Sequence, residues 1–301
     1  MVCIDPVWVT PIATEHSMPN PILVTGATGN IGRELVKQLK AAGAHVIAGS
    51  PSGESVARLV ETRHVDFVDP ASLKRAFQGI DTLFLLFPLQ ANMVELARNA
   101  VAAAKAAGVK HIVRSSGAGA DASSPVAIAR VQGEIDQLVI DSGIAYTLLR
   151  PNSFMQNFLN FYAGMIRGGA LYLPQGQGKV SFVDTRDIAA VAAAVLQQPA
   201  DHAGKVYTLT GGEALSNADV AACIGAALGR TISYVPVSDE AAITSMRQAG
   251  MTAWSIETLM SLNRIIAAGY TAEVSPDVQR VLGRAPIRFD RFVADNLAAW
   301  R

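Results

Sequence analysis

The chain has 301 residues, which is enough to bury a substantial core as one large domain or two small ones. Its 25 basic and 25 acidic residues cancel, so no overall field favours nucleic acid or an anionic membrane, and we expect a small-molecule partner. Only two cysteines are present, Cys3 and Cys223, which excludes a disulfide framework and a cysteine-based metal cluster.

The first twenty residues do not have the pattern of a targeting signal. The segment 1–20 lacks a basic start, an apolar stretch and a small-residue cleavage site, so we interpret it as a flexible leader, with Met18 as an alternative natural start. Further along, Gly, Asp, Lys or Pro interrupts every apolar run before the ~20 residues needed to cross a bilayer. We therefore expect a cytoplasmic protein, either a monomer or a homodimer, that binds no membrane and no metal.

From Pro21 the pattern alternates between strands and helices. Runs rich in Val, Ile, Leu and Phe predict six strands, at 22–25, 45–49, 65–68, 82–87, 111–115 and 146–149. Nearly continuous apolar strands separated by helices indicate a parallel sheet that is buried on both faces. The sequence therefore predicts an α/β fold, a doubly wound parallel sheet of the Rossmann type, over residues 21–150.

A glycine-rich loop joins the first strand to the first helix. Gly26 permits a tight turn, Gly29 lets the backbone approach a pyrophosphate, and Gly32 allows close packing of helix on strand. The free amides at the start of the helix then point at the phosphates. Glycine clusters also mark ordinary turns, but this context predicts an NAD(P) site. The residues predicted to face the cofactor here are Gly26, Thr28, Gly29, Asn30, Ile31 and Gly32.

The end of the second strand bears on the choice between NAD and NADP. An acidic residue there would bind the ribose hydroxyls and repel a 2′-phosphate, yet the strand ends at Ser50 with no acid before Glu54. With Arg33 or Arg58 nearby, this pattern favours NADP and leaves NAD possible.

The end of the third strand offers a further contact to the cofactor. Asp66 and Phe67 place a carboxylate and a ring where adenine is expected, and the alternative is an ordinary strand end that caps the next helix.

After Arg150 the alternation loosens. Helices are predicted at 153–167, 185–197, 217–228, 238–250 and 254–268, with short strands around Val206 and Ile232. We interpret residues 151–301 as a smaller α+β substrate-side lobe, partly interleaved with the core. Asp184 and Asp187 are interpreted as caps of a helix start. The apolar segment 254–268 is interpreted as a core helix of the lobe, with a cover over the substrate or a subunit contact as alternatives.

Four segments together resemble the NmrA-like branch of the atypical short-chain dehydrogenases/reductases, near the quinone and triphenylmethane dye reductases. They are the glycine loop, Ser115-Ser-Gly-Ala, Leu149-Arg-Pro-Asn-Ser-Phe-Met-Gln-Asn157 and Phe182-Val-Asp-Thr-Arg-Asp-Ile188. The resemblance implies a nicotinamide near the ends of the fourth and fifth strands, beside Phe87, Pro88 and Ser116. It also implies that Asn152, Ser153 or Phe154 lines this side of the cleft. As alternatives, Phe87 is strand core and Ser115 and Ser116 cap a turn.

The chain lacks the Tyr-x-x-x-Lys pair that members of the superfamily use for proton transfer. By the resemblance, Arg130 and Glu134 stand near those two positions, and one alternative is a simple i,i+4 ion pair. If both face the cleft, Arg130 stabilises negative charge on a reduced acceptor, Glu134 holds the guanidinium, and protons come from solvent or from Ser115 or Ser116. Tyr146, Tyr162 and Tyr172 are further candidate proton donors.

These observations favour an NAD(P)H-dependent oxidoreductase whose acceptor is small and aromatic or conjugated, such as a quinone or a dye. The main alternative is a protein of a different functional class: an NADP(H)-sensing regulator of the NmrA type with little or no enzymatic turnover. A sugar-nucleotide epimerase is a weaker alternative, because that chemistry would need the missing tyrosine.

Overall fold

The computed structural model describes residues 21–53 and 60–301. The leader at 1–20, Glu54 and Arg58 lie outside the described residues. A seven-stranded, all-parallel sheet runs through the molecule in the order β3-β2-β1-β4-β5-β6-β9. The strands are β1 (Ile22–Val24), β2 (Val46–Ser50), β3 (Glu61–His64), β4 (Thr82–Leu85), β5 (His111–Ser115), β6 (Ala145–Pro151) and β9 (Lys205–Leu209). The predicted doubly wound Rossmann sheet is therefore confirmed.

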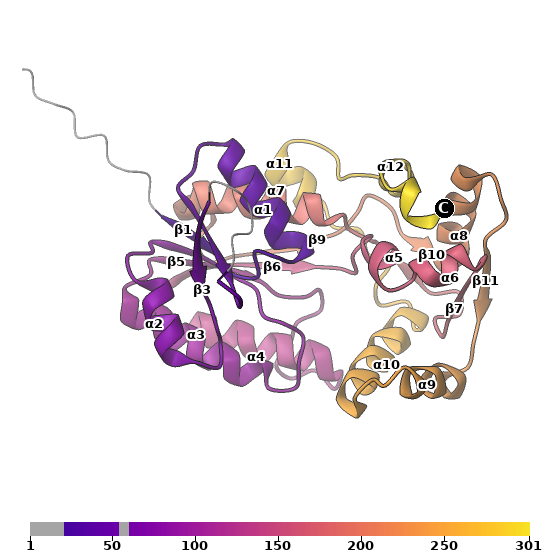
Figure 1. Ribbon diagram of the computed structural model, residues 1–301, viewed down its shortest axis with the longest axis horizontal. Coiled ribbons are helices and arrows are strands. Elements are labelled where there is room, and N and C mark those ends of the chain that lie inside the picture. The colour runs from indigo at the N-terminus through magenta and orange to yellow at the C-terminus, as the bar shows by residue number, and fades with distance from the viewer. Residues whose placement is uncertain (1–20, 54–59) are drawn as a thin grey trace, which may run out of the picture.

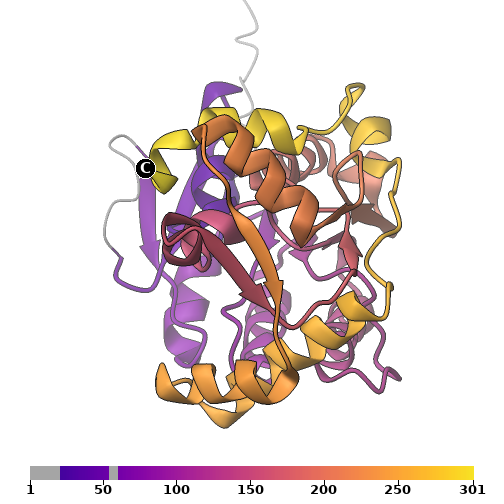
Figure 2. The same cartoon turned by 90° about the vertical axis from the view of Figure 1, so that its right-hand side faces the viewer.

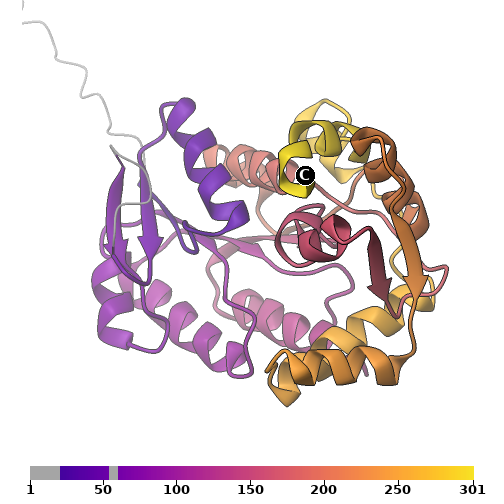
Figure 3. The ribbon, with the colours of Figure 1, turned by 45° about the vertical axis from the view of Figure 1, so that its right-hand side comes forward.

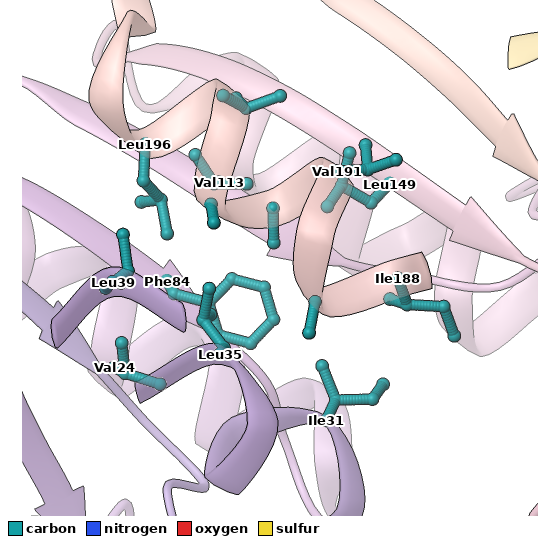
Figure 4. Close-up of a cluster of buried hydrophobic side chains, with 14 of the residues drawn as sticks. Val24, Ile31, Leu35, Leu39, Phe84, Val113, Leu149, Ile188, Val191 and Leu196 are labelled. Atoms are coloured by element: carbon teal, nitrogen blue, oxygen red, sulfur yellow. The ribbon is translucent and has the colours of Figure 1, made fainter. Parts of the chain in front are cut away.

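Two layers of helices cover the sheet (Figure 1). On one face lie α1 (Asn30–Ala41) and α7 (Thr185–Gln197), and on the other lie α2 (Pro70–Phe77), α3 (Met93–Ala107) and α4 (Ala127–Asp141). Successive strand residues alternate between the two cores, so Val24 packs under α1 and α7 while Leu23 packs under the opposite layer. Figure 4 shows the first core, to which Leu35 of α1, Val191 of α7 and Phe84 of β4 belong, with Leu35 beside the ring of Phe84.

The third strand differs from its prediction. It spans Glu61–His64, not 65–68, and pairs with β2 so that His64 lies beside Ser50. The strand forms the edge of the sheet and its side chains are exposed or half-buried, so it carries no apolar run. The apolar residues at 65–68 form the following turn instead, in which the carboxylate of Asp66 accepts from the amide of Val68 at 2.9 Å.

A smaller lobe follows β6. Its elements are α5 (Asn157–Asn160), α6 (Ala163–Arg167), β7 (Ala170–Leu173), β8 (Lys179–Val180), β10 (Leu215–Ser216), α8 (Asn217–Leu228), β11 (Ser233–Pro236), α9 (Asp239–Gln248), α10 (Ala253–Ala267), and α12 (Phe289–Asp295). Figure 2 shows β7 beside β11, with which it pairs in parallel. Aromatic side chains form the core of the lobe, with Phe158 against Phe182 and Phe289.

One helix prediction for the second half was wrong. The helix predicted at 153–167 is two short helices, because Phe154 forms a bridge with Val183 and the chain turns at residues 155–156, where Met155 donates to the carbonyl of Val183. The strand predicted around Val206 is present as β9, and it joins the main sheet beside β6. Asp184 caps α7 as predicted, accepting from the amide of Arg186, and buried Asp187 accepts from the amide of Ile287.

A buried histidine at the start of β5 is linked through β6 to the short 3-10 helix that precedes β9. Nε2 of His111 lies 2.9 Å from Oγ1 of Thr147, and that hydroxyl donates to the carbonyl of His202 at 2.7 Å. Since the hydroxyl hydrogen is used there, His111 carries its own hydrogen on Nε2 and donates to Thr147. Burial, with the charge of His202 adding to it, lowers the pKa of His111 from 6.5 to about 4.

We expect this histidine to make the protein less stable in acid. Between pH 6.5 and about 4 the unfolded chain binds a proton at His111 that the folded chain does not, so the free energy of unfolding falls as the pH falls, by at most about 3 kcal/mol. The measurement is urea unfolding between pH 4 and 8 for the wild type and for His111→Gln, which keeps a donor toward Thr147. In the variant, the free energy of unfolding should fall less steeply as the pH is lowered. Parallel plots of unfolding free energy against pH for the two proteins would contradict the expectation.

Candidate cofactor and acceptor site

The glycine loop after β1 has the conformation that its spacing predicts. Gly26 has a φ of +65°, a left-handed turn that glycine adopts without strain. A Cβ on Gly32 would lie 2.2 Å from the carbonyl oxygen of Gly26, so only glycine fits where helix α1 meets the turn. Gly29 has an extended backbone at the start of α1. A Cβ added to Gly29 would meet no backbone clash, because the nearest atom, the carbonyl oxygen of Gly26, would lie 3.4 Å away.

The amides at the start of α1 are free to bind an anion. Gly29 caps the helix without a side-chain hydrogen bond, and among the described residues no acceptor meets the amides of Asn30, Ile31 and Gly32. The side chain of Ile31 is buried in the core, so this residue offers its backbone alone. The guanidinium of Arg33 donates to the carbonyl of Thr28 at 2.8 Å and so holds the loop from outside.

A cleft of about 430 Å³ opens beside the glycine loop, over the carboxyl ends of β1, β2 and β4. Its walls include seven of the residues predicted to bind the cofactor: Gly26, Thr28, Gly29, Asp66, Phe67, Phe87 and Pro88. The rings of Phe67 and Phe87 touch, with centroids 4.8 Å apart, and form an apolar wall. Thr25 joins the neighbouring strand ends, since its Oγ1 donates to the carbonyl of Phe84 and accepts from the amide of Leu86. The cleft thus combines flat apolar walls with a loop that leads into α1, where the first backbone amides have no partner among the described residues.

Seven of the predicted cofactor residues do not line this cleft: Asn30, Ile31, Gly32, Ser50, Ser116, Asn152 and Phe154. Ser50 is fully buried and its hydroxyl lies 3.1 Å from that of Ser52. Asn152 donates to the hydroxyl of Ser181 and to the carbonyl of Thr271, so its amide fastens the end of β6 to the lobe. Phe154 forms a bridge with Val183.

The end of β5 carries an unpaired polar group. Ser116 is 9% exposed, and its hydroxyl has no hydrogen-bond partner in the described part of the chain. The amide of Ser116 donates to Leu149 and that of Ala118 to Pro151, which keeps this loop against β6. Ser115 is buried at the last position of the strand. A buried hydroxyl without a partner is costly, which favours a ligand at this position.

Arg130 and Glu134 do not form the ion pair that one alternative predicted. The guanidinium of Arg130 donates to the carbonyl of Ser124 at 3.0 Å, and Glu134 takes part in none of the ion pairs found among residues 21–53 and 60–301. Both side chains are half-buried.

Sequence reasoning missed the polar cluster on the same helix. Arg114 of β5 is fully buried, and its Nη1 lies 2.5 Å from Oδ1 of Asp136 while its Nη2 donates to Oε1 of Gln132 at 2.6 Å. The other carboxylate oxygen of Asp136 pairs with Arg150 of β6 at 2.9 Å. Burial lowers the pKa of Arg114 to about 10, which still leaves it charged at neutral pH. The signal in the sequence was the arginine inside an otherwise apolar strand.

A second groove, of about 400 Å³, lies between the start of α4 and α10. Figure 3 shows α10 (orange) close to α4, with which it is in contact. One side is formed by Pro125, Val126 and Ala127, and the other by Glu257, Ser261, Arg264, Ile265, Ala268 and Tyr270. Thr271, the neighbour of Tyr270, holds Asn152 through its carbonyl, so the groove adjoins the carboxyl end of β6. The segment 254–268 is indeed a helix, and it contributes one wall of this groove.

The three tyrosines considered as proton donors line neither the cleft nor the groove. Tyr146 packs against the core near the amino end of β6, Tyr162 belongs to the lobe core, where burial raises its pKa, and Tyr172 is half-exposed on β7. Within residues 21–53 and 60–301, no group of three His, Cys, Asp or Glu side chains is placed to hold a metal, and no helix is long and apolar enough to span a membrane.

Comparisons with known proteins agree with this geometry. The sequence matches the model of the NmrA-like family over residues 18–270. An NAD(P)H azoreductase of Xenophilus azovorans is 40% identical over 283 residues, which cover 93% of this chain and 99% of that protein.

Solved structures give the same result. An NADPH-dependent quinone oxidoreductase of Escherichia coli, complexed with NADPH, has a TM-score of 0.82 at 28% identity, covering 91% of this chain and 99% of that one. The Citrobacter sp. triphenylmethane reductase complexed with NADP(H) has a TM-score of 0.81 at 29% identity, with the same coverage. NmrA, a negative transcriptional regulator solved with NADP, is 17% identical with a TM-score of 0.78 and shares the fold alone.

Proposed function

The chain belongs to the NmrA-like family, and on that premise we propose that it is an NAD(P)H-dependent oxidoreductase that reduces a small aromatic or conjugated acceptor, such as a quinone or a dye. The observation that carries the proposal is the cleft beside the glycine loop, where free helix amides adjoin a wall of two aromatic rings. This combination suits a dinucleotide, because the pyrophosphate needs donors and the adenine needs flat apolar surface.

NADP(H) is the cofactor that these features favour, with NAD(H) also possible. Asn30, Ile31 and Gly32 would hold the pyrophosphate through their amides. Phe67 and Phe87 would pack against the adenosine half. The second strand ends at Ser50 without an acidic residue before residue 54, so no carboxylate there repels a 2′-phosphate. The reductases that match this chain are named for NAD(P)H or were solved with NADP(H).

The nicotinamide end of the site would lie at the end of β5. When bound, the reduced nicotinamide supplies a hydride. Ser116 would donate its free hydroxyl to the cofactor, and Pro88 and Phe154 would limit the position of the ring. The role of Ser115 as a source of protons is a prediction, and so is the position of Asn152 next to the nicotinamide ring.

The acceptor would enter through the groove between α4 and α10, which leads toward the end of β6. Since the sequence has no Tyr-x-x-x-Lys pair, the acceptor must take its final proton from water or a hydroxyl. Acceptors that form a stable anion on reduction satisfy that requirement. We predict that Arg130 is a cation that stabilises this negative charge and that Glu134 holds its guanidinium during turnover.

We expect the purified protein to oxidise NADPH steadily when a quinone, an azo dye or a triphenylmethane dye is added, because the site supplies a hydride donor and these acceptors need no protein acid. The measurement is the decay of the reduced-nicotinamide absorbance with a panel of such acceptors, and protein-free mixtures provide the control. Tight NADPH binding without decay across the panel would favour the NADP(H)-sensing regulator instead.

A further inference from the structure

Arg114 forces the orientation of the Gln132 side-chain amide. A guanidinium has donors and no acceptor, so the oxygen of the amide must face it, as the 2.6 Å contact between Nη2 and Oε1 shows. The amide nitrogen Nε2 therefore points the other way. Among the described residues no acceptor meets this nitrogen, and it does not belong to the buried polar atoms that lack a partner. Gln132 thus presents a fixed N–H donor to accessible space.

This donor lies beside the loop that follows β5. A Cβ added to Gly117 would lie 3.6 Å from Cγ and 4.0 Å from Cδ of Gln132, so the amide packs along the open side of Gly117. Gly117 directly follows Ser116, whose hydroxyl is buried and unpaired. Gln132 and Ser116 therefore flank the same residue, at the strand end where the proposed function puts hydride transfer.

The charges behind Gln132 favour an anion in front of it. Two guanidiniums, from Arg114 and Arg150, share the single carboxylate of Asp136, so these three side chains carry a net positive charge, which the nearby carboxylate of Asp121 offsets on the Arg150 side. The only other ionisable side chains of α4 are Arg130, Glu134 and Asp141, of which Arg130 bonds to Ser124 and Asp141 to Gln137. A buried cation that bonds the amide oxygen makes its N–H a stronger donor.

We infer that Gln132 donates a hydrogen bond to the acceptor oxygen or nitrogen that becomes negatively charged, and that Arg114 is the positioning residue that holds the amide in this orientation. The inference rests on the proposed function and adds the group that polarises the acceptor. In the reaction, a quinone takes up one hydride, gaining two electrons and one hydrogen, and becomes a hydroquinone monoanion while the nicotinamide is left oxidised. A proton from water completes the hydroquinone. Gln132 would stabilise the monoanion, as a preorganised donor does for an oxyanion.

The test is Gln132→Glu. Glutamate keeps the shape and an oxygen for Arg114, so the fold is retained, but it replaces the donor by a second oxygen. We expect kcat with a benzoquinone to fall roughly 100-fold, the effect of losing one donor to a developing oxyanion, while the Kd for NADPH changes by less than about threefold. The loss should shrink for quinones with electron-withdrawing substituents, whose anions need less stabilisation. A structural defect would lower kcat equally for all quinones.

The matched control is Gln137→Glu on the same helix, where the side chain is exposed and bonds only to Asp141. It should keep the wild-type kinetics. A second readout needs no turnover: a phenolate that is ionised at neutral pH, titrated by calorimetry in the presence of NADP⁺, should bind at least about tenfold more weakly to Gln132→Glu than to the wild type.

The outcomes separate the two proposals. If the wild type oxidises NADPH and Gln132→Glu equals it with every quinone, the role of Gln132 is overturned and the proposed function stands. If the wild type turns over no acceptor, the proposed function fails, and the phenolate titration decides on Gln132 by itself. Equal phenolate affinity in both proteins would then overturn the inference.

Discussion

Replacing Gly29 by alanine is expected to weaken NADPH binding by roughly 10- to 100-fold with little change in stability. Gly29 has an ordinary extended backbone that alanine also adopts, and its new Cβ would lie 3.4 Å from the nearest atom, so the loop keeps its shape. The methyl group would instead occupy the space through which a pyrophosphate approaches the helix amides. Binding is measured by titration calorimetry and stability by thermal unfolding.

Two further variants make this result specific. Gly164→Ala changes a glycine of α6 that has no atom within 4 Å of the added Cβ, and it should leave both affinity and Tm unchanged. Gly32→Ala forces the methyl group into the backbone of Gly26 and Ala27, so it should lower affinity and Tm together. If Gly29→Ala binds NADPH as the wild type does, the pyrophosphate does not lie at this loop.

The second large effect is expected at Asp136. Replacing it by leucine removes the carboxylate that Arg114 and Arg150 share, which leaves the fully buried charge of Arg114 without its counter-ion. Breaking a buried pair in this way costs about 3–5 kcal/mol. For a protein of this size we expect a fall in Tm of roughly 5–10 °C, measured by calorimetry.

The double variant Arg114→Met, Asp136→Leu distinguishes the lost pair from lost packing. It removes both buried charges, and an apolar pair of similar volume should restore most of the stability. Asp141→Leu, near the exposed end of the same helix, serves as the control and should change the free energy of unfolding by less than about 1 kcal/mol. If Asp136→Leu is no less stable than this control, the cluster does not stabilise the fold.

Local patterns were sufficient to predict most of the fold. The helices at 185–197 and 217–228 have the predicted bounds, because Asp184 and Ser216 cap them with their own side chains and the signal is contained in a few adjacent residues. The edge strand β3 was misplaced because an edge strand need not be apolar. The strand β9 was predicted, but its neighbour in the sheet was not, because the pairing of residues 147–151 with 205–209 depends on both segments together.

The candidate site was predicted where the backbone determines it. The glycine loop and the rings of Phe67 and Phe87 follow from strand ends that meet at one edge of a parallel sheet. The cluster around Arg114 was not found, because the partners of this buried arginine come from a helix 18 and 22 positions away, and only packing selects Gln132 and Asp136 from the other polar residues of α4.

The path of the chain ties the two halves into a single cooperative unit. After leaving the sheet at Pro151 the chain returns to it through α7 and β9, and later again through α11 (Asp277–Leu282), which packs on both. A fragment that ended at Arg150 would expose the face that α7 covers and would leave β6 as an open sheet edge. The first half of the sheet therefore depends on distant sequence for its own integrity, and the lobe cannot be exchanged by cutting the chain at a single linker.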